Sequence, residues 1–205
     1  MSRLIELVKS GASIKEIKAD LWDNRQVDGY VNIQRRPHGM TALMWAAKNG
    51  DSHMVDLLLK EGADANAQNN YGNSALVWAC RRGFTDIIEK LTDAGADTNV
   101  ATIENGNSPL MEAVHREDIE QVKLLLSKGA NVNHVNNVGI SSIRWAIFRN
   151  NFELIKLLLE AGANNVDDLN RIINHENQQV RSLLQIQTWD VINGKRYLLV
   201  EVTSN

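Results

Sequence analysis

A seven-residue phrase recurs along this chain at a nearly constant interval. It reads Lys-Glu-Gly-Ala-Asp-Ala-Asn around Gly62 and returns in modified form around Gly95, Gly129 and Gly162. The steps between these glycines are 33, 34 and 33 residues. A fixed period of this size predicts a solenoid, in which each unit buries its apolar face only by stacking on its neighbours. We therefore expect an extended contact surface and no single enclosed pocket.

Each repeating unit reads as two short helices. Thr41 can cap the first helix, over residues 41–48, and Gly50 can supply the turn that follows. The second helix carries Met54 and the leucines before Gly62, where it ends. The same pattern predicts helix pairs at 74–81 with 86–92, 108–115 with 118–127, and 141–148 with 151–160. Polar segments rich in asparagine and glycine link the pairs and suit tight turns, at 68–72, 102–106 and 135–139.

The two ends of the chain depart from the repeat, as the ends of a one-dimensional stack must. Residues 3–24 and 167–187 carry apolar residues at helical spacing and are expected to form capping helices. Beyond them, Asn193-Gly194 between two apolar runs predicts a β-hairpin. We divide the chain into a cap (1–37), four repeats (38–70, 71–104, 105–137, 138–166), a second cap (167–187) and the hairpin (188–205).

The predicted last strand is apolar on both faces, through Leu198, Leu199, Val200 and Val202, so something should cover it. It can fold back on the last helices, pair with another copy of the chain as a homo-oligomer, or accept a strand from a partner. The sequence leaves these three arrangements open.

Composition restricts the class of protein. The chain has 205 residues, 43% of them hydrophobic and 23% charged, as in ordinary globular proteins. Its formal net charge of −3 argues against a generally basic nucleic-acid binder. The lone Cys80 cannot form an internal disulfide. Because we find neither a signal peptide nor a transmembrane segment, we expect a cytoplasmic protein, or one delivered into a host cytoplasm.

The start of each helix pair carries a family resemblance. The runs are GMTALMWAA from Gly39, GNSALVWAC from Gly72, GNSPLMEAV from Gly106 and the looser GISSIRWAI from Gly139. Together with the Gly-Ala-Asp-x-Asn element, they resemble the ankyrin repeat over residues 38–170. The histidine of the family pattern is absent, replaced by Met44, Val77, Met111 and Arg144. Glu117 and Asn150 stand where Gly50 and Gly83 sit in the earlier units. If the backbone keeps a positive φ there, Glu117 carries strain.

The resemblance implies an all-α solenoid of antiparallel helix pairs, with hairpin fingers projecting from one side. The first helices would line a concave face. Members of the family are overwhelmingly protein-binding modules that make contact through this face and the fingers. Roles that fit such a stand-alone module are an effector, an inhibitor or an immunity protein.

If the ankyrin register holds, equivalent side chains form a ladder on the first helices. The candidate partner-binding residues are Trp45, Trp78, Glu112 and Trp145, then Lys48, Arg81, His115 and Phe148, then Arg82, Arg116 and Arg149, and Tyr71 on a finger. Trp and Arg are enriched at binding hot spots, and a basic groove would favour an acidic partner segment. Two other interpretations stand beside this one: the tryptophans pack between repeats, and the arginines form a solvated face.

Other kinds of chemistry find little support in the sequence. We expect no catalytic residue, no cofactor and no metal site, because the histidines are scattered and Cys80 sits at a buried small-residue position. Aromatic and basic residues together also bind single-stranded nucleic acid, but Glu112 and the net charge oppose that function. Asn66, Asn99 and Asn133 are expected to hydrogen-bond their own turns. The rival hypothesis is an enzyme or an enzyme-recognition subunit, with its activity or partner contacts in residues 167–205.

Overall fold

The computed structural model describes residues 3–35, 37–165, 167–168 and 170, and the backbone of 185–192 and 195–201. Within these residues the chain forms ten α-helices and one short 3-10 helix, Tyr30–Asn32. The helices are α1 (Arg3–Ser10), α2 (Ile14–Asp23), α3 (Ala42–Asn49), α4 (Ser52–Lys60), α5 (Ala75–Arg82), α6 (Thr85–Asp93), α7 (Pro109–His115), α8 (Ile119–Ser127), α9 (Ser142–Phe148) and α10 (Phe152–Glu160).

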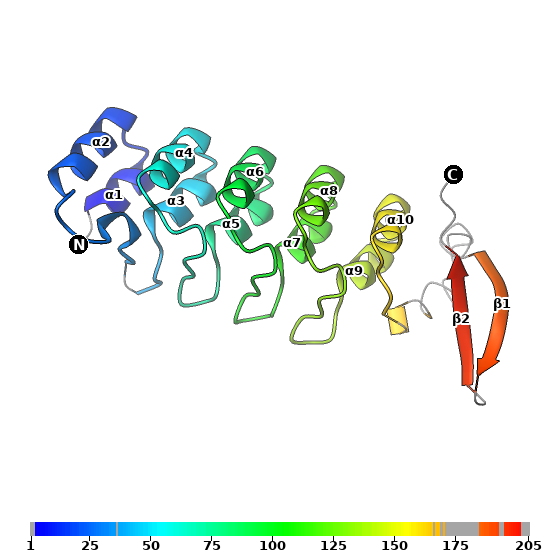
Figure 1. Ribbon diagram of the computed structural model, residues 1–205. Helices are drawn as coiled ribbons and strands as arrows, with labels where there is room; N and C mark the ends of the chain where they lie inside the picture. Colours follow the sequence, from blue (N-terminus) through cyan, green and yellow to red (C-terminus); the bar gives the residue numbers. More distant parts are fainter. Residues whose placement is uncertain are drawn as a thin grey trace.

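The helices stack as pairs in a single row, with loops projecting from one side (Figure 1). The first helix of each pair packs on the first helix of the next, so α1, α3, α5, α7 and α9 form one layer. The second helices α4, α6, α8 and α10 form the other layer, and α2 continues their row at the N-terminal end (Figure 1). We call these the inner and outer helices, and the projecting loops the fingers. The all-α ankyrin-type solenoid predicted from the sequence is confirmed.

Each inner helix of the four repeats begins at a hydroxyl cap. The side-chain oxygens of Thr41, Ser74, Ser108 and Ser141 accept a hydrogen bond from the backbone N–H three residues on, at 3.2–3.4 Å. Such a cap satisfies one of the N–H groups that a helix start leaves unpaired. It therefore fixes where the helix begins, and with it the direction of every side chain that follows.

The core runs without interruption through the stack. The apolar residue two positions after each cap is at most 1% exposed: Leu43, Leu76, Leu110 and Ile143. The matching leucines of the outer helices are fully buried: Leu58, Leu91, Leu125 and Leu158. Because each unit contributes one such pair, its apolar face is covered only when its neighbours are present.

The expectation that Asn66, Asn99 and Asn133 hydrogen-bond their own turns is wrong. Each bridges to the next unit: Asn66 Nδ2 donates to the Gly95 carbonyl at 2.9 Å, and Asn66 Oδ1 accepts from Asp97 N at 2.7 Å. Asn99, Asn133 and also Asn32 of the N-terminal segment repeat this double contact. The own-turn role falls to Asp64, Asp97 and Asn131, whose Oδ1 atoms accept from those asparagines' N–H groups. Each of these asparagine side chains therefore makes two hydrogen bonds with the next unit, one to a backbone carbonyl and one to a backbone N–H.

Glu117 has a backbone φ of 60°, where Gly50 and Gly83 have 78° and 87°. A residue with a Cβ is strained in this left-handed region by about 1 kcal/mol or more. We expect Glu117→Gly to raise the free energy of unfolding by about 1 kcal/mol, measured by urea denaturation. Glu117→Ala retains the Cβ and should bring no such gain. Equal effects of the two variants would show that strain is not the cause.

In the C-terminal part of the chain, β1 (Gln185–Ile192) pairs antiparallel with β2 (Lys195–Glu201). The register pairs Ile192 with Lys195 at one end and Gln185 with Glu201 at the other, with an irregularity between Ile186 and Thr188. The side chains of these strands and most of the expected second cap lie outside the described residues. What covers the last strand therefore stays a prediction, as does the activity considered for residues 167–205.

Candidate binding face on the inner helices

The inner helices bring tryptophans and lysines of successive units into one stack. Lys48 Nζ lies 4.7 Å from the ring centroid of Trp45 and 4.5 Å from that of Trp78 in the next unit. Lys9 of α1 covers Trp45 as well, at 5.4 Å. These distances are in the range of cation–π contacts. We call Lys9, Trp45, Lys48 and Trp78 the cation–indole stack.

Packing between repeats, one of the two interpretations of the tryptophans, applies to this stack, and contact with a partner stays a prediction. The rings of Trp45 and Trp78 are partly buried against the core, and their indole N–H groups are buried with no acceptor among the described residues. The rings therefore do pack between units. The ring faces are in contact with cations, because Lys48 lies over both Trp45 and Trp78 and so connects two successive units.

The centre of the inner face is a polar network that the chain itself satisfies. Arg81 donates to Asn73 Oδ1 at 2.7 Å and to Glu112 Oε1 at 3.0 Å. Asn107 Nδ2 lies 3.4 Å from the same Glu112 oxygen. Glu112 is only 9% exposed, so its charge needs this pairing. Arg81 and Glu112 are thus committed to each other, and they divide the inner face into two halves.

Beyond this network lies an aromatic cluster of three residues, His115, Trp145 and Phe148. The rings of His115 and Trp145 meet edge to face with centroids 5.2 Å apart, and Trp145 meets Phe148 in the same way at 6.3 Å. Phe148 is 79% exposed, the largest fraction among the exposed large hydrophobic residues of the described chain. All three residues belong to the ladder expected from the sequence, and the structure brings them into contact between α7 and α9.

Three arginines lie at the C-terminal ends of inner helices, and all are exposed: Arg82, Arg116 and Arg149. Arg116 donates to the Arg81 carbonyl at 3.2 Å, and its guanidinium lies against Gly83, where an added Cβ would come within 2.4 Å of it. Arg149 contacts His115 Nε2 at 3.4 Å. Within the described residues, none of the three lies in an ion pair.

The fingers add exposed apolar side chains next to this face. Tyr71 is 45% exposed, and its hydroxyl shares a hydrogen bond with His38 Nδ1 of the preceding finger at 3.0 Å. Ile103 and Val138 of the next two fingers are 67% and 72% exposed. Single backbone hydrogen bonds join neighbouring fingers, as from Ile103 N to the Tyr71 carbonyl at 2.9 Å. The fingers therefore form a continuous edge.

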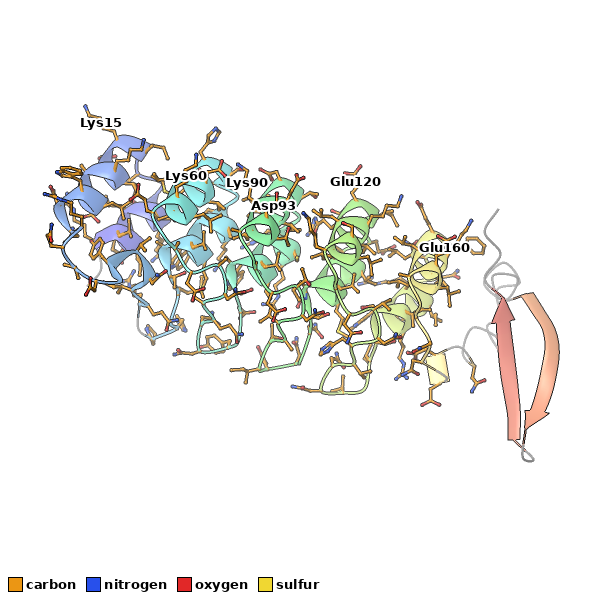
Figure 2. All side chains as sticks on the ribbon, viewed as in Figure 1. Lys15, Lys60, Lys90, Asp93, Glu120 and Glu160 are labelled. Atoms are coloured by element: carbon orange, nitrogen blue, oxygen red, sulfur yellow. The ribbon has the colours of Figure 1, made fainter. Side chains whose placement is uncertain are left out.

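Charge separates between the two layers of the four repeats. The inner helices α3, α5, α7 and α9 contain one acid, Glu112, and four basic residues, Lys48, Arg81, Arg82 and Arg144. The outer helices contain four lysines, Lys60, Lys90, Lys123 and Lys156, and seven acids, Asp56, Asp86, Glu89, Asp93, Glu120, Glu153 and Glu160. Figure 2 labels several charged side chains of the outer helices. The net charge of −3 thus hides a basic inner layer.

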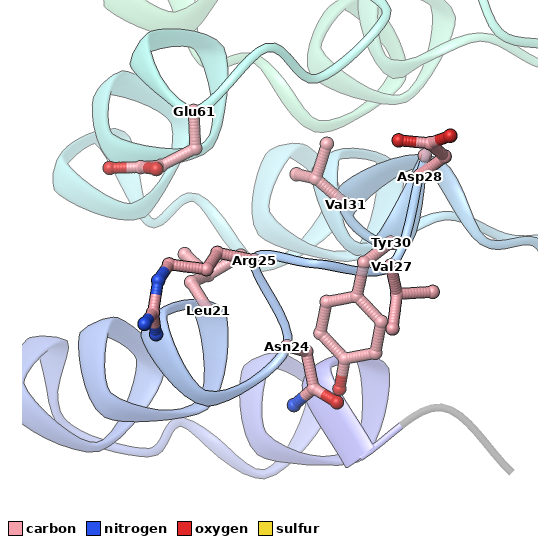
Figure 3. A pocket seen from close by; sticks show the side chains of 9 residues that line it. Leu21, Asn24, Arg25, Val27, Asp28, Tyr30, Val31 and Glu61 are labelled. Atoms are coloured by element: carbon pink, nitrogen blue, oxygen red, sulfur yellow. The ribbon is translucent and has the colours of Figure 1, made fainter.

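Other features of the described residues suggest no chemistry. A hollow of about 250 Å³ between α2, the 3-10 helix and Glu61 is open to solvent and smaller than usual ligand sites (Figure 3). Burial raises the pKa of the Cys80 thiol, which keeps it protonated and unreactive. No group of three or more potential metal ligands occurs in the part of the chain that the structure describes. No helix of that part is both long and apolar enough to cross a bilayer.

A family model of ankyrin repeats (three copies) matches residues 9–102 and again residues 98–169. The chain belongs to the ankyrin repeat family. Ankyrin repeats are generally protein–protein interaction modules, and they are typically non-enzymatic. Comparison with curated proteins finds no match. Family membership thus gives this ankyrin-repeat protein its general role, while the choice of partner depends on its own side chains.

Proposed function

We propose that this ankyrin-repeat protein binds a partner protein across its inner face, without chemistry of its own. The binding residues are those of the sequence ladder together with Tyr71: Trp45, Lys48, Trp78, Arg81, Arg82, Glu112, His115, Arg116, Trp145, Phe148 and Arg149. The separation of charge between the layers carries the proposal. Each layer has four basic residues, but the inner helices have one acid and the outer helices seven, so the inner layer is positive and also holds Trp45, Trp78 and Trp145.

A protein of this kind can act by occupying the surface of its partner. We therefore propose the role of an effector, inhibitor or immunity protein in a cytoplasm, with the inner face as the surface that contacts the partner. A homo-oligomer through the C-terminal strand is compatible with this role, since that strand lies apart from the inner helices in the sequence.

Tryptophan variants test the proposal with a control inside the same chain. Trp78→Ala should weaken binding to a partner isolated by affinity capture by about tenfold or more, or roughly 1–2 kcal/mol. Trp22 of the outer helix α2 is 67% exposed, so Trp22→Ala removes an equal side chain from the opposite layer. Binding is measured by calorimetry.

Trp78 also packs on the core, so its loss can affect stability. Arg82→Ala provides a second variant, because Arg82 is exposed and has no ion pair among the described residues. We expect it to weaken binding with unchanged thermal unfolding. Full affinity in both variants, or equal losses in Trp78→Ala and Trp22→Ala, would contradict binding by the inner face.

A further inference from the structure

The cations of the cation–indole stack have no acid of their own. Within residues 3–35, 37–165, 167–168 and 170, Lys9 and Lys48 contact only tryptophan rings and lie in no ion pair. Other lysines differ in this respect: Lys90 of α6 pairs with Asp56, Lys156 of α10 pairs with Glu160 at 3.9 Å, and Lys128, which follows α8, pairs with Asp93 at 2.6 Å. The inner lysines are therefore positioned by aromatic rings, while their charges remain unneutralised.

The opposite half of the inner face has a different chemistry. Its aromatic cluster ends in Phe148, which is 79% exposed. Between the two halves, Arg81 and Glu112 neutralise each other at 3.0 Å. The inner face therefore offers a lysine–tryptophan subsite at α1 to α5 and an aromatic subsite at α7 and α9, with the exposed Arg149 at the edge of the second. The neutral network separates the two subsites.

We propose that the inner face binds an extended acidic segment of the partner protein in one orientation, and this inference rests on the proposed function. Carboxylates of the segment's acidic side chains pair with Lys9 and Lys48. The methylene groups of the same acidic side chains lie against Trp45 and Trp78. A large apolar side chain further along the segment packs on Phe148 and Trp145. Complementary charge favours this partner, because a second basic segment would be repelled from the same surface.

The distance between neighbouring inner helices sets the spacing between the acidic part of the segment and its apolar side chain. Neighbouring packed helices lie about 8–10 Å apart, so the three steps from α3 to α9 span roughly 30 Å. An extended peptide advances about 3.3 Å per residue, so about nine residues separate its acids from its apolar anchor. A designed peptide can therefore carry both elements.

The probe is a fluorescein-labelled synthetic peptide with four glutamates, a Gly-Ser spacer of about nine residues and one phenylalanine. Its affinity for the full chain is measured by fluorescence anisotropy. Lys9→Gln with Lys48→Gln should weaken binding at least tenfold. The matched control, Lys60→Gln with Lys123→Gln, removes the same charge from exposed positions of outer helices and should change it less than twofold. Phe148→Ala should weaken binding severalfold, and raising the salt concentration should weaken it in the unaltered chain.

Each other outcome overturns the proposal. Equal losses in the two lysine pairs would mean non-specific charge attraction, and absence of peptide binding at millimolar concentration would exclude an acidic segment. Tighter binding of a uridine oligonucleotide through the same lysines would assign the surface to nucleic acid. If the isolated partner still depends on Trp78 and Arg82 while the lysine pair has no effect, binding by the inner face stands and the acidic segment is rejected.

Discussion

Asp168→Ala should cost about 3–5 kcal/mol of stability, concentrated at the C-terminal end of the stack. The Asp168 side chain is fully buried, and its carboxylate accepts hydrogen bonds from Ser141 Oγ and Arg144 Nε. Ser141 is also the cap of α9, accepting from Arg144 N at 3.2 Å. Removing the carboxylate leaves Arg144, 24% exposed, without its counter-charge and frees the capping hydroxyl.

Because units of a solenoid contact only their neighbours, this loss should be local. Amide hydrogen exchange should accelerate in α9 and α10, while α3 to α6 retain their protection. Asp167→Ala is the matched control, since Asp167 is the exposed adjacent residue of the same type. If amide hydrogen exchange in α9 and α10 is the same in the two variants, the buried carboxylate does not stabilise the C-terminal end of the solenoid.

Asn99→Ala should lower the free energy of unfolding by about 2 kcal/mol, from two hydrogen bonds of about 1 kcal/mol each. Asn99 Nδ2 donates to the Gly129 carbonyl at 3.3 Å, and its Oδ1 accepts from Asn131 N at 2.7 Å. Both contacts cross the boundary between two repeats. Chemical denaturation measures this loss of stability. The substitution should also reduce the cooperativity of unfolding between the two halves of the solenoid.

Asp97→Ala tests whether the effect belongs to the bridge. Among the described residues, Asp97 Oδ1 accepts only from Asn99 N, at 2.8 Å, which is a contact inside one turn. We therefore expect about half the loss, with cooperativity retained. A larger loss from Asp97→Ala than from Asn99→Ala would reverse this assignment.

The fold could be predicted because its determinants recur at a fixed period. The caps, the buried leucines and the helix-ending glycines each return at 33 or 34 residues, so a misreading of one unit is corrected by the others. The positive φ at Glu117 was predictable for the same reason, since Gly50 and Gly83 mark that position.

The asparagine bridges were missed although the sequence contains a signal for them. The position held by Asn66, Asn99 and Asn133 is occupied by Val166 in the last repeat, which has no full repeat after it. An asparagine serving only its own turn would be expected there as well. Asp168 gave no comparable signal, because its partner Arg144 lies 24 residues away and Asp168 itself lies beyond the last repeat.

The positions of the proposed binding residues on the inner helices could be predicted, but their contacts could not. Register alone places Trp45, Trp78 and Trp145 on one ladder. That Lys48 lies between two of these rings depends on the distance and rotation between units, which one sequence does not specify. The pairing of Arg81 with Glu112 depends on the same geometry.

Site-specific photocrosslinking tests binding by the inner face most directly. A photoreactive phenylalanine is placed at Tyr71, Arg82 or Phe148 near the inner face, and at Trp22, Lys60 or Lys123 on outer helices. All six positions are exposed, so the substitution should leave the fold unchanged. We predict that the isolated partner crosslinks at the first three positions and not at the other three. Crosslinks confined to the outer helices would contradict binding by the inner face.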